Sequence, residues 1–73
     1  MEKRIKNAMK RVFELDNIDD NISQINCDKW DSMNHLNLII ELESEFNISF
    51  EPEEIAIMKN YDMIKKYVSF RIE

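Results

Sequence analysis

The sequence predicts an all-α fold, a single domain spanning residues 1–73 and built as a four-helix bundle with three long helices and one short helix. Apolar residues recur at the three- and four-residue spacing of amphipathic helices in separate segments, and no segment shows the alternation of a strand. The composition, with 44% hydrophobic and 34% charged residues, is typical of a globular protein rather than a disordered one. A chain of 73 residues can bury one small core.

The first helix is predicted from a single apolar stripe at the start of the chain, with lysines on the opposite side. The stripe consists of Ile5, Ala8, Met9, Val12 and Phe13. From Leu15 to Asp31 this period disappears, and Asn, Asp and Ser accumulate as in a long loop. We expect three isoleucines, Ile18, Ile22 and Ile25, to pin that loop to the core.

The second helix is predicted to begin at Asp31-Ser32, because Asp31 is a good N-cap whose carboxylate can accept the free amide hydrogens of the first turn. Its many apolar positions indicate a central helix with a broad apolar face. These positions are Met33, Leu36, Leu38, Ile39, Ile40, Leu42 and Phe46. Asn47 can close the helix in the left-handed conformation, a role that usually falls to glycine, which this chain lacks.

Two further helices are predicted in the last third of the chain. Pro52 suits the first turn of a short helix that runs from Glu53 to about Met58. Asn60 can cap a last helix. The apolar residues of that last helix share one face, and they are Ile64, Tyr67, Val68 and Ile72.

The net charge of −5 is unevenly distributed. The first thirteen residues carry five bases against Glu2 alone, whereas residues 14–57 carry twelve acids and one base, Lys29. Such a negative field repels nucleic acid and anionic lipid and attracts a basic protein surface, so we expect neither nucleic-acid nor membrane binding. No apolar run approaches the ~20 residues that span a bilayer. The single cysteine, Cys27, cannot form an internal disulfide, so we expect the reducing environment of the cytoplasm. We also expect the protein to be a monomer.

The most informative stretch is Trp30-Asp31-Ser32-Met33, which places a serine at the very start of an amphipathic helix. A hydroxyl in that position suits a covalent phosphate ester, since the negative charge of the ester would lie near the free amides and the positive end of the helix dipole. Such a serine needs no activating base in its own chain if a separate transferase supplies the catalysis.

The helix pattern carries a family resemblance. Asp31-Ser32-Met33, in step with Leu36, Leu42, Glu43, Glu45, Phe46 and Ile48, resembles the phosphopantetheine-attachment helix of acyl carrier proteins, and the four-segment layout resembles that family over nearly the whole chain. The resemblance implies an acyl-carrier-like bundle that is not itself an enzyme. It implies that Ser32 carries covalent 4′-phosphopantetheine, transferred from coenzyme A, and that Asp31 assists this magnesium-dependent modification.

The resemblance also implies the partners: a phosphopantetheinyl transferase, an acyl-loading ligase or synthase, and acyl-transferring enzymes. We expect the nearest partner contacts to come from Trp30, Met33, His35 and Leu36, with anchoring of the loop as the alternative role of Trp30. Carriers of fatty acid synthesis typically have acids where this chain has Asn34 and Asn37. We therefore hypothesise a specialised pathway, with fatty acyl, hydroxyacyl, malonyl-type and aminoacyl cargo all open.

Two other functions compete with the carrier. One is an unmodified acidic interaction module, in which Ser32 is only a helix start. The other is a small hydrolase built on Ser32 and His35, which lie one turn apart, although it would need an orienting carboxylate and an oxyanion hole. The acids Asp16, Asp19 and Asp20 do not follow the spacing of a calcium-binding EF-hand, so we expect no metal site.

Overall fold

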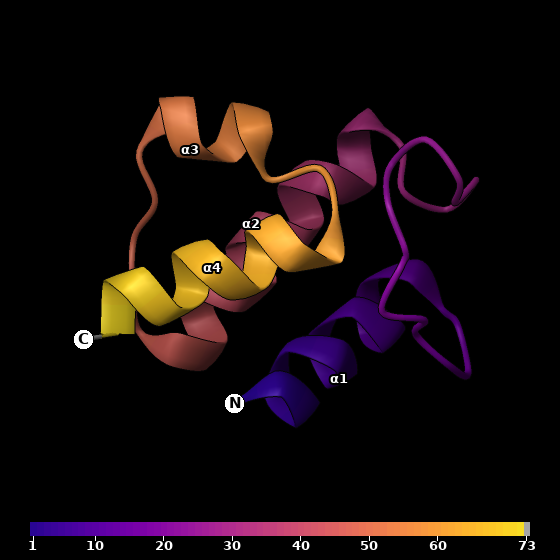
Figure 1. The fold of residues 1–73 in the computed structure, drawn as a ribbon, viewed down its shortest axis with the longest axis horizontal. Coiled ribbons are helices and arrows are strands. Elements are labelled where there is room, and N and C mark those ends of the chain that lie inside the picture. The colour runs from indigo at the N-terminus through magenta and orange to yellow at the C-terminus, as the bar shows by residue number, and fades with distance from the viewer. Residues whose placement is uncertain (73) are drawn as a thin grey trace.

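The computed structural model describes residues 1–72, which fold into four helices with no strand among them (Figure 1). They are α1 (Glu2–Phe13), α2 (Ser32–Phe46), α3 (Pro52–Ile57) and α4 (Tyr61–Ile72). The prediction of an all-α bundle with three long helices and one short helix is thus confirmed. Figure 1 shows α4 crossing in front of α2, with α1 and α3 at opposite edges of the molecule. None of the described helices has the length and the apolar character needed to cross a membrane.

The main helix pair of the bundle is α1 against α2. Four residues of the predicted α1 stripe are buried: Ile5, Ala8, Met9 and Phe13. On the outer side of this pair, Arg4 Nε lies 2.8 Å from Glu45 Oε2 and Arg11 Nη2 lies 2.7 Å from Glu41 Oε2. The basic face of α1 is therefore matched to acids of α2.

A backbone bridge between Ser23 and Asn60 ties the loop from Glu14 to Asp31 to the segment just before α4. The amide of Tyr61 donates to the Ile22 carbonyl at 3.1 Å, and the amide of Gln24 donates to the Lys59 carbonyl at 2.9 Å. Ile18 and Ile22 are buried, as expected.

The expectation for Ile25 is wrong, because its side chain is 99% exposed. The reason is a local turn: the Ser23 amide donates to Asn26 Oδ1 at 2.9 Å, and the Asn26 amide lies 3.3 Å from Ser23 Oγ. This side-chain-closed turn places Ile25 at its tip, away from the core. An apolar residue type in a loop does not by itself determine burial.

Helix α2 has the predicted boundaries. Asp31 Oδ1 accepts a hydrogen bond from the Asn34 amide at 2.8 Å, and Asn47 ends the helix at φ 56° and ψ 52°, in the left-handed region. The buried apolar positions are Leu38, Ile39 and Leu42. The broad apolar face expected for this helix is only partly buried, because Met33, Leu36 and Ile40 are 73%, 57% and 64% exposed. These three residues form a second stripe that faces away from α1 and the core.

The two remaining helices also begin as predicted. Pro52 is at the first position of α3, where Glu51 and Glu54 form a reciprocal capping box. Asn60 Oδ1 accepts from the Met63 amide at 2.8 Å at the start of α4. Helix α4 buries Tyr61, Ile64 and Val68, whereas Ile72, expected on the same face, is 45% exposed. No side chain of α3 is fully buried, so this helix is the one held least by the core.

Candidate functional site

The candidate site is the N-terminus of α2. Ser32 is the first residue of the helix and is exposed, and it directly follows the N-cap Asp31, which is also exposed. Asp31 occupies two amides of the first turn: its side chain accepts from Asn34, and its carbonyl accepts from His35 at 2.8 Å. The amides of Ser32 and Met33 come before these two, where a helix offers no internal acceptor. The hydroxyl of Ser32 therefore stands at the positive end of a 15-residue helix.

A hollow of about 390 Å³ opens beside Ser32, between the start of α2, the short helix α3 and the loop near the bridge. Its lining is Gln24, Ser32, His35, Leu36, Ile55, Ala56 and Lys59. Apolar residues of α2 and α3 form part of the lining, and Gln24 and Lys59 add residues with polar side chains. Three of the predicted site residues, Ser32, His35 and Leu36, are thus brought together around one hollow.

The structure corrects the expected contact role of Trp30. Its side chain is 1% exposed and packs on Phe13, with ring centroids 5.2 Å apart. A side chain with so little accessible surface cannot contribute directly to a docking surface. The alternative role, anchoring the loop in front of α2, agrees with this packing. Trp30 is buried because Phe13, at the end of α1, offers an aromatic surface directly beneath that loop.

His35 is likewise buried, with 9% of its surface exposed, so it too is corrected as a direct contact. The Trp30 indole Nε1–H donates to His35 Nδ1 at 3.0 Å, and His35 Nε2 lies 2.8 Å from the carbonyl oxygen of Ile55. Because an indole N–H only donates and a carbonyl only accepts, the ring must be the neutral tautomer with its hydrogen on Nε2. Both nitrogens are therefore occupied, and neither is free to take a proton from Ser32.

Met33 and Leu36 are the two predicted contact residues that are exposed. With Ile40 they form an i, i+3, i+7 stripe along the outer side of α2, starting next to Ser32. Two further apolar residues, Ile25 and Ile57, are 99% and 48% exposed. The spacing of the α2 residues could have separated this stripe from the buried one, but the apolar character of Ile25 does not mark it as exposed.

The acidic side chains of α2 make ion pairs and hydrogen bonds with other residues of the same chain. Glu41 and Glu45 pair with the arginines of α1, and Glu43 Oε2 accepts from the Phe50 amide at 2.9 Å. The hydrogen bond from Arg4, together with its positive charge, lowers the pKa of the Glu45 carboxyl. Among the described residues, no ion pair involves Asp31, the carboxylate that directly precedes Ser32 in the chain.

The side chains of Asn34 and Asn37 form a short hydrogen-bonded chain at the start of α2. Asn34 Nδ2 donates to the Lys29 carbonyl at 2.8 Å, and Asn37 Nδ2 donates to Asn34 Oδ1 at 3.0 Å. The chain connects the loop to the first two turns of the helix and presents neutral amides on the surface beside the candidate site.

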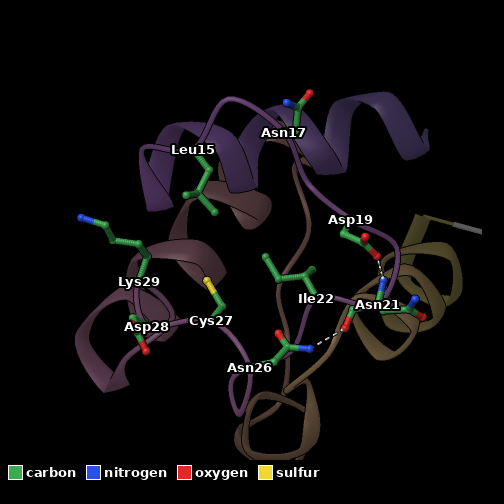
Figure 2. A pocket seen from close by; sticks show the side chains of 9 residues that line it. All are labelled: Leu15, Asn17, Asp19, Asn21, Ile22, Asn26, Cys27, Asp28 and Lys29. Carbon is green, nitrogen blue, oxygen red and sulfur yellow. Dashed lines mark hydrogen bonds between the residues drawn. The ribbon is translucent and has the colours of Figure 1, made fainter.

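A second, larger hollow of about 590 Å³ lies in the loop between α1 and α2 (Figure 2). Cys27, Leu15 and Ile22 lie on its inner side, where Leu15 and Cys27 pack against the core, and asparagines and aspartates surround its mouth. Hydrogen bonds from the Asn21 amide to Asp19 Oδ1 and from Asn26 Nδ2 to the Asn21 carbonyl shape the rim. The described residues contain no group of three or more metal-ligating side chains here or elsewhere.

Comparison with known proteins adds no family assignment, because no family model matches the chain and no curated protein matches it.

Proposed function

We propose that this protein is an acyl carrier that holds acyl or aminoacyl groups as thioesters on a 4′-phosphopantetheine arm attached to Ser32 and presents them to partner enzymes. The observation that carries the proposal is the position of Ser32: an exposed hydroxyl on the first residue of α2, behind the N-cap Asp31 and at the edge of a hollow. The family resemblance of the surrounding helix supports the same assignment.

The chemistry of the site fits a phosphodiester on Ser32. A transferase can reach the hydroxyl, since Ser32 protrudes from the helix start and its neighbour Met33 is 73% exposed. The negative charge of the resulting diester would be stabilised by the free amides at the start of α2 and by the helix dipole. Once attached, the arm supplies the thiol that forms the thioester, and the protein itself provides the anchor and the docking surface.

Asp31 suits a double role. Its Oδ1 caps the helix through the Asn34 amide, while the exposed carboxylate keeps its second oxygen for a magnesium ion or a metal-bound water during the transfer. The cap also places the Ser32 hydroxyl beside this carboxylate. Cap and modification therefore depend on the same side chain through different atoms.

Partner enzymes would meet the exposed stripe of Met33, Leu36 and Ile40. Apolar side chains that are exposed in a row next to the modified serine can be buried on docking without disturbing the core. The neutral asparagines Asn34 and Asn37 stand beside this stripe, so at these two positions a partner that selects acids would meet amides instead. This surface supports a specialised pathway rather than fatty acid synthesis.

The competing functions are distinguished by His35 and by Ser32. The engagement of both His35 nitrogens weighs against a Ser32–His35 hydrolytic pair. The interaction module shares the exposed stripe but needs no modification, so it predicts that Ser32→Ala changes nothing in partner binding.

The deciding experiment is incubation of the purified protein with coenzyme A, magnesium and a promiscuous phosphopantetheinyl transferase, followed by intact-mass measurement. We expect the mass to rise by one phosphopantetheine in the wild type and to stay constant in Ser32→Ala. Circular dichroism confirms that both proteins are folded. A folded wild type that gains no mass would refute the carrier and favour the interaction module.

A further inference from the structure

Helix α3 forms one wall of the hollow beside Ser32, yet it is weakly anchored. None of its residues is fully buried, and its six residues allow few internal hydrogen bonds. Ile55 packs against the core while staying partly exposed, and two side chains from other helices make polar contacts with α3: Arg71 of α4 pairs with Glu54, and His35 of α2 meets the carbonyl of Ile55. The contact of His35 lies at the hollow itself, because His35 and Ile55 both line it.

The Ile55 carbonyl is available to His35 for a local reason. A carbonyl in the last turn of a helix lacks its usual donor, which is the amide four residues later in the chain. Here the amide of Lys59 turns instead to the Ile57 carbonyl at 2.9 Å, and the amide of Met58 reaches Ile55 only at 3.4 Å. His35 Nε2, which lies 2.8 Å from the Ile55 carbonyl oxygen, is the nearest donor to this carbonyl. It acts as a side-chain cap supplied by a different helix.

The other ring nitrogen of His35 is held by a residue of the core. Trp30 donates to Nδ1, and the two rings lie with centroids 6.2 Å apart and an interplanar angle of 26°. Trp30 in turn rests on Phe13 of α1. A continuous path therefore leads from the core, through the indole and the imidazole, to the backbone of α3. The tautomer that the indole imposes is the one that can donate to Ile55.

We infer that His35 is a positioning residue, which fastens α3 to the base of α2 and thereby keeps the hollow beside Ser32 in the shape that receives the phosphopantetheine arm. The arm leaves Ser32 at the mouth of this hollow. Its apolar methyl groups suit the walls formed by Leu36, Ile55 and Ala56, and its amides and hydroxyl suit Gln24 and Lys59. The inference rests on the proposed function for the identity of the arm, whereas the fastening of α3 is independent of it.

Two matched variants separate the contacts of His35. The side-chain oxygen of His35→Asn can take the place of Nδ1 and keep the bond from Trp30, but it cannot reach Ile55. The side-chain nitrogen of His35→Gln can take the place of Nε2 and keep the bond to Ile55, while the Trp30 contact is lost. Both variants put one amide into the same buried position, so a general loss of core packing is expected in both, whereas only His35→Asn removes the bond to α3.

The first measurement is amide hydrogen exchange of the unmodified protein, followed at Met58, whose amide bonds back to Glu54 across α3 at 3.1 Å. The amide of Leu42, in the middle of α2, reports on opening of the whole bundle. Relative to Leu42, we expect exchange at Met58 to be about fivefold faster in His35→Asn than in the wild type and near the wild-type rate in His35→Gln, as the loss of one hydrogen bond implies. Equal rates in both variants would overturn the fastening role.

The second measurement compares amide chemical shifts before and after modification of Ser32. In the wild type and in His35→Gln, we expect the Ile55 and Ala56 amides to shift when the arm is attached, and in His35→Asn we expect these shifts to shrink at least twofold. A mass gain without shifts in α3 would refute the seating of the arm and leave the carrier intact. The absence of any mass gain would instead refute the carrier, while the exchange rates would still decide whether His35 fastens α3.

Discussion

Asp31 offers the sharpest test of the site, because its role in folding and its role in modification can be separated by one atom. The cap is a single hydrogen bond of 2.8 Å from the Asn34 amide to Oδ1. Removing an N-cap side chain costs about 1 kcal/mol, within a range of 0.5–2, whereas asparagine caps as well as aspartate does. Asp31→Ala should therefore lose about 1 kcal/mol of unfolding free energy, and Asp31→Asn only a few tenths.

Urea denaturation measures this difference, with the fluorescence of the buried Trp30, the single tryptophan of the chain, as the signal. A domain of this size has a denaturant slope of about 1 kcal/mol per molar urea. The unfolding midpoint of Asp31→Ala should therefore fall by about 1 M, while that of Asp31→Asn stays close to the wild type.

The modification assay should rank the same variants differently. If the carboxylate assists the magnesium-dependent transfer, Asp31→Asn and Asp31→Ala should both gain phosphopantetheine at least tenfold more slowly than the wild type. If the Asp31→Asn variant gained phosphopantetheine at the wild-type rate, the role of the charge would be refuted. If it unfolded at as low a urea concentration as Asp31→Ala, the capping geometry would be refuted.

Three further predictions concern the fold. Burial and the nearby charge of Glu2 raise the pKa of Tyr61 to about 12, so the folded state prefers the neutral phenol. The contribution of this phenol to stability should be full below pH 10 and be lost as the pH rises through 12, and alkaline urea titrations should find a smaller loss of stability in Tyr61→Phe than in the wild type. Hydrogen bonds from the Glu51 amide and from Arg71 lower the pKa of Glu54, so the contribution of its carboxylate to folding stability is present above pH 4.5 and is lost as the pH falls further. Acid titration followed by circular dichroism should show that the stability of Glu54→Gln depends less on pH. Ile25→Ser should change the unfolding free energy by less than about 0.5 kcal/mol in the urea assay, and a loss above 1 kcal/mol would contradict its exposure.

The helix boundaries were predictable because their causes are local. Asp31, Asn47 and Asn60 act on amides or carbonyls within a few residues of themselves, and Pro52 restricts only its own turn. Such energies do not depend on the rest of the fold. The same holds for Ser32, whose place at the start of α2 follows directly from the cap before it.

The ion-pair partner of a side chain and its burial both depend on residues that lie far apart in the chain. The sequence could not show that Glu45 would pair with Arg4, 41 positions away, since surface charges pair with whatever packing brings near. Nor could it show that Ile25 would be exposed while Ile22 is buried, because the turn and the bridge to α4 decide which side chains point inward.

What the sequence by itself determined is an all-α chain with a serine exposed at the start of its central helix. The tertiary structure decided what surrounds that serine. It buried Trp30 and His35, because Phe13 offered a packing surface and the Ile55 carbonyl a hydrogen-bond acceptor, and it left Met33 and Leu36 outside. The physical reason is that a cap is a contact between near neighbours in the chain, whereas the hollow beside Ser32 exists only because α2, α3 and the loop before α2 meet there.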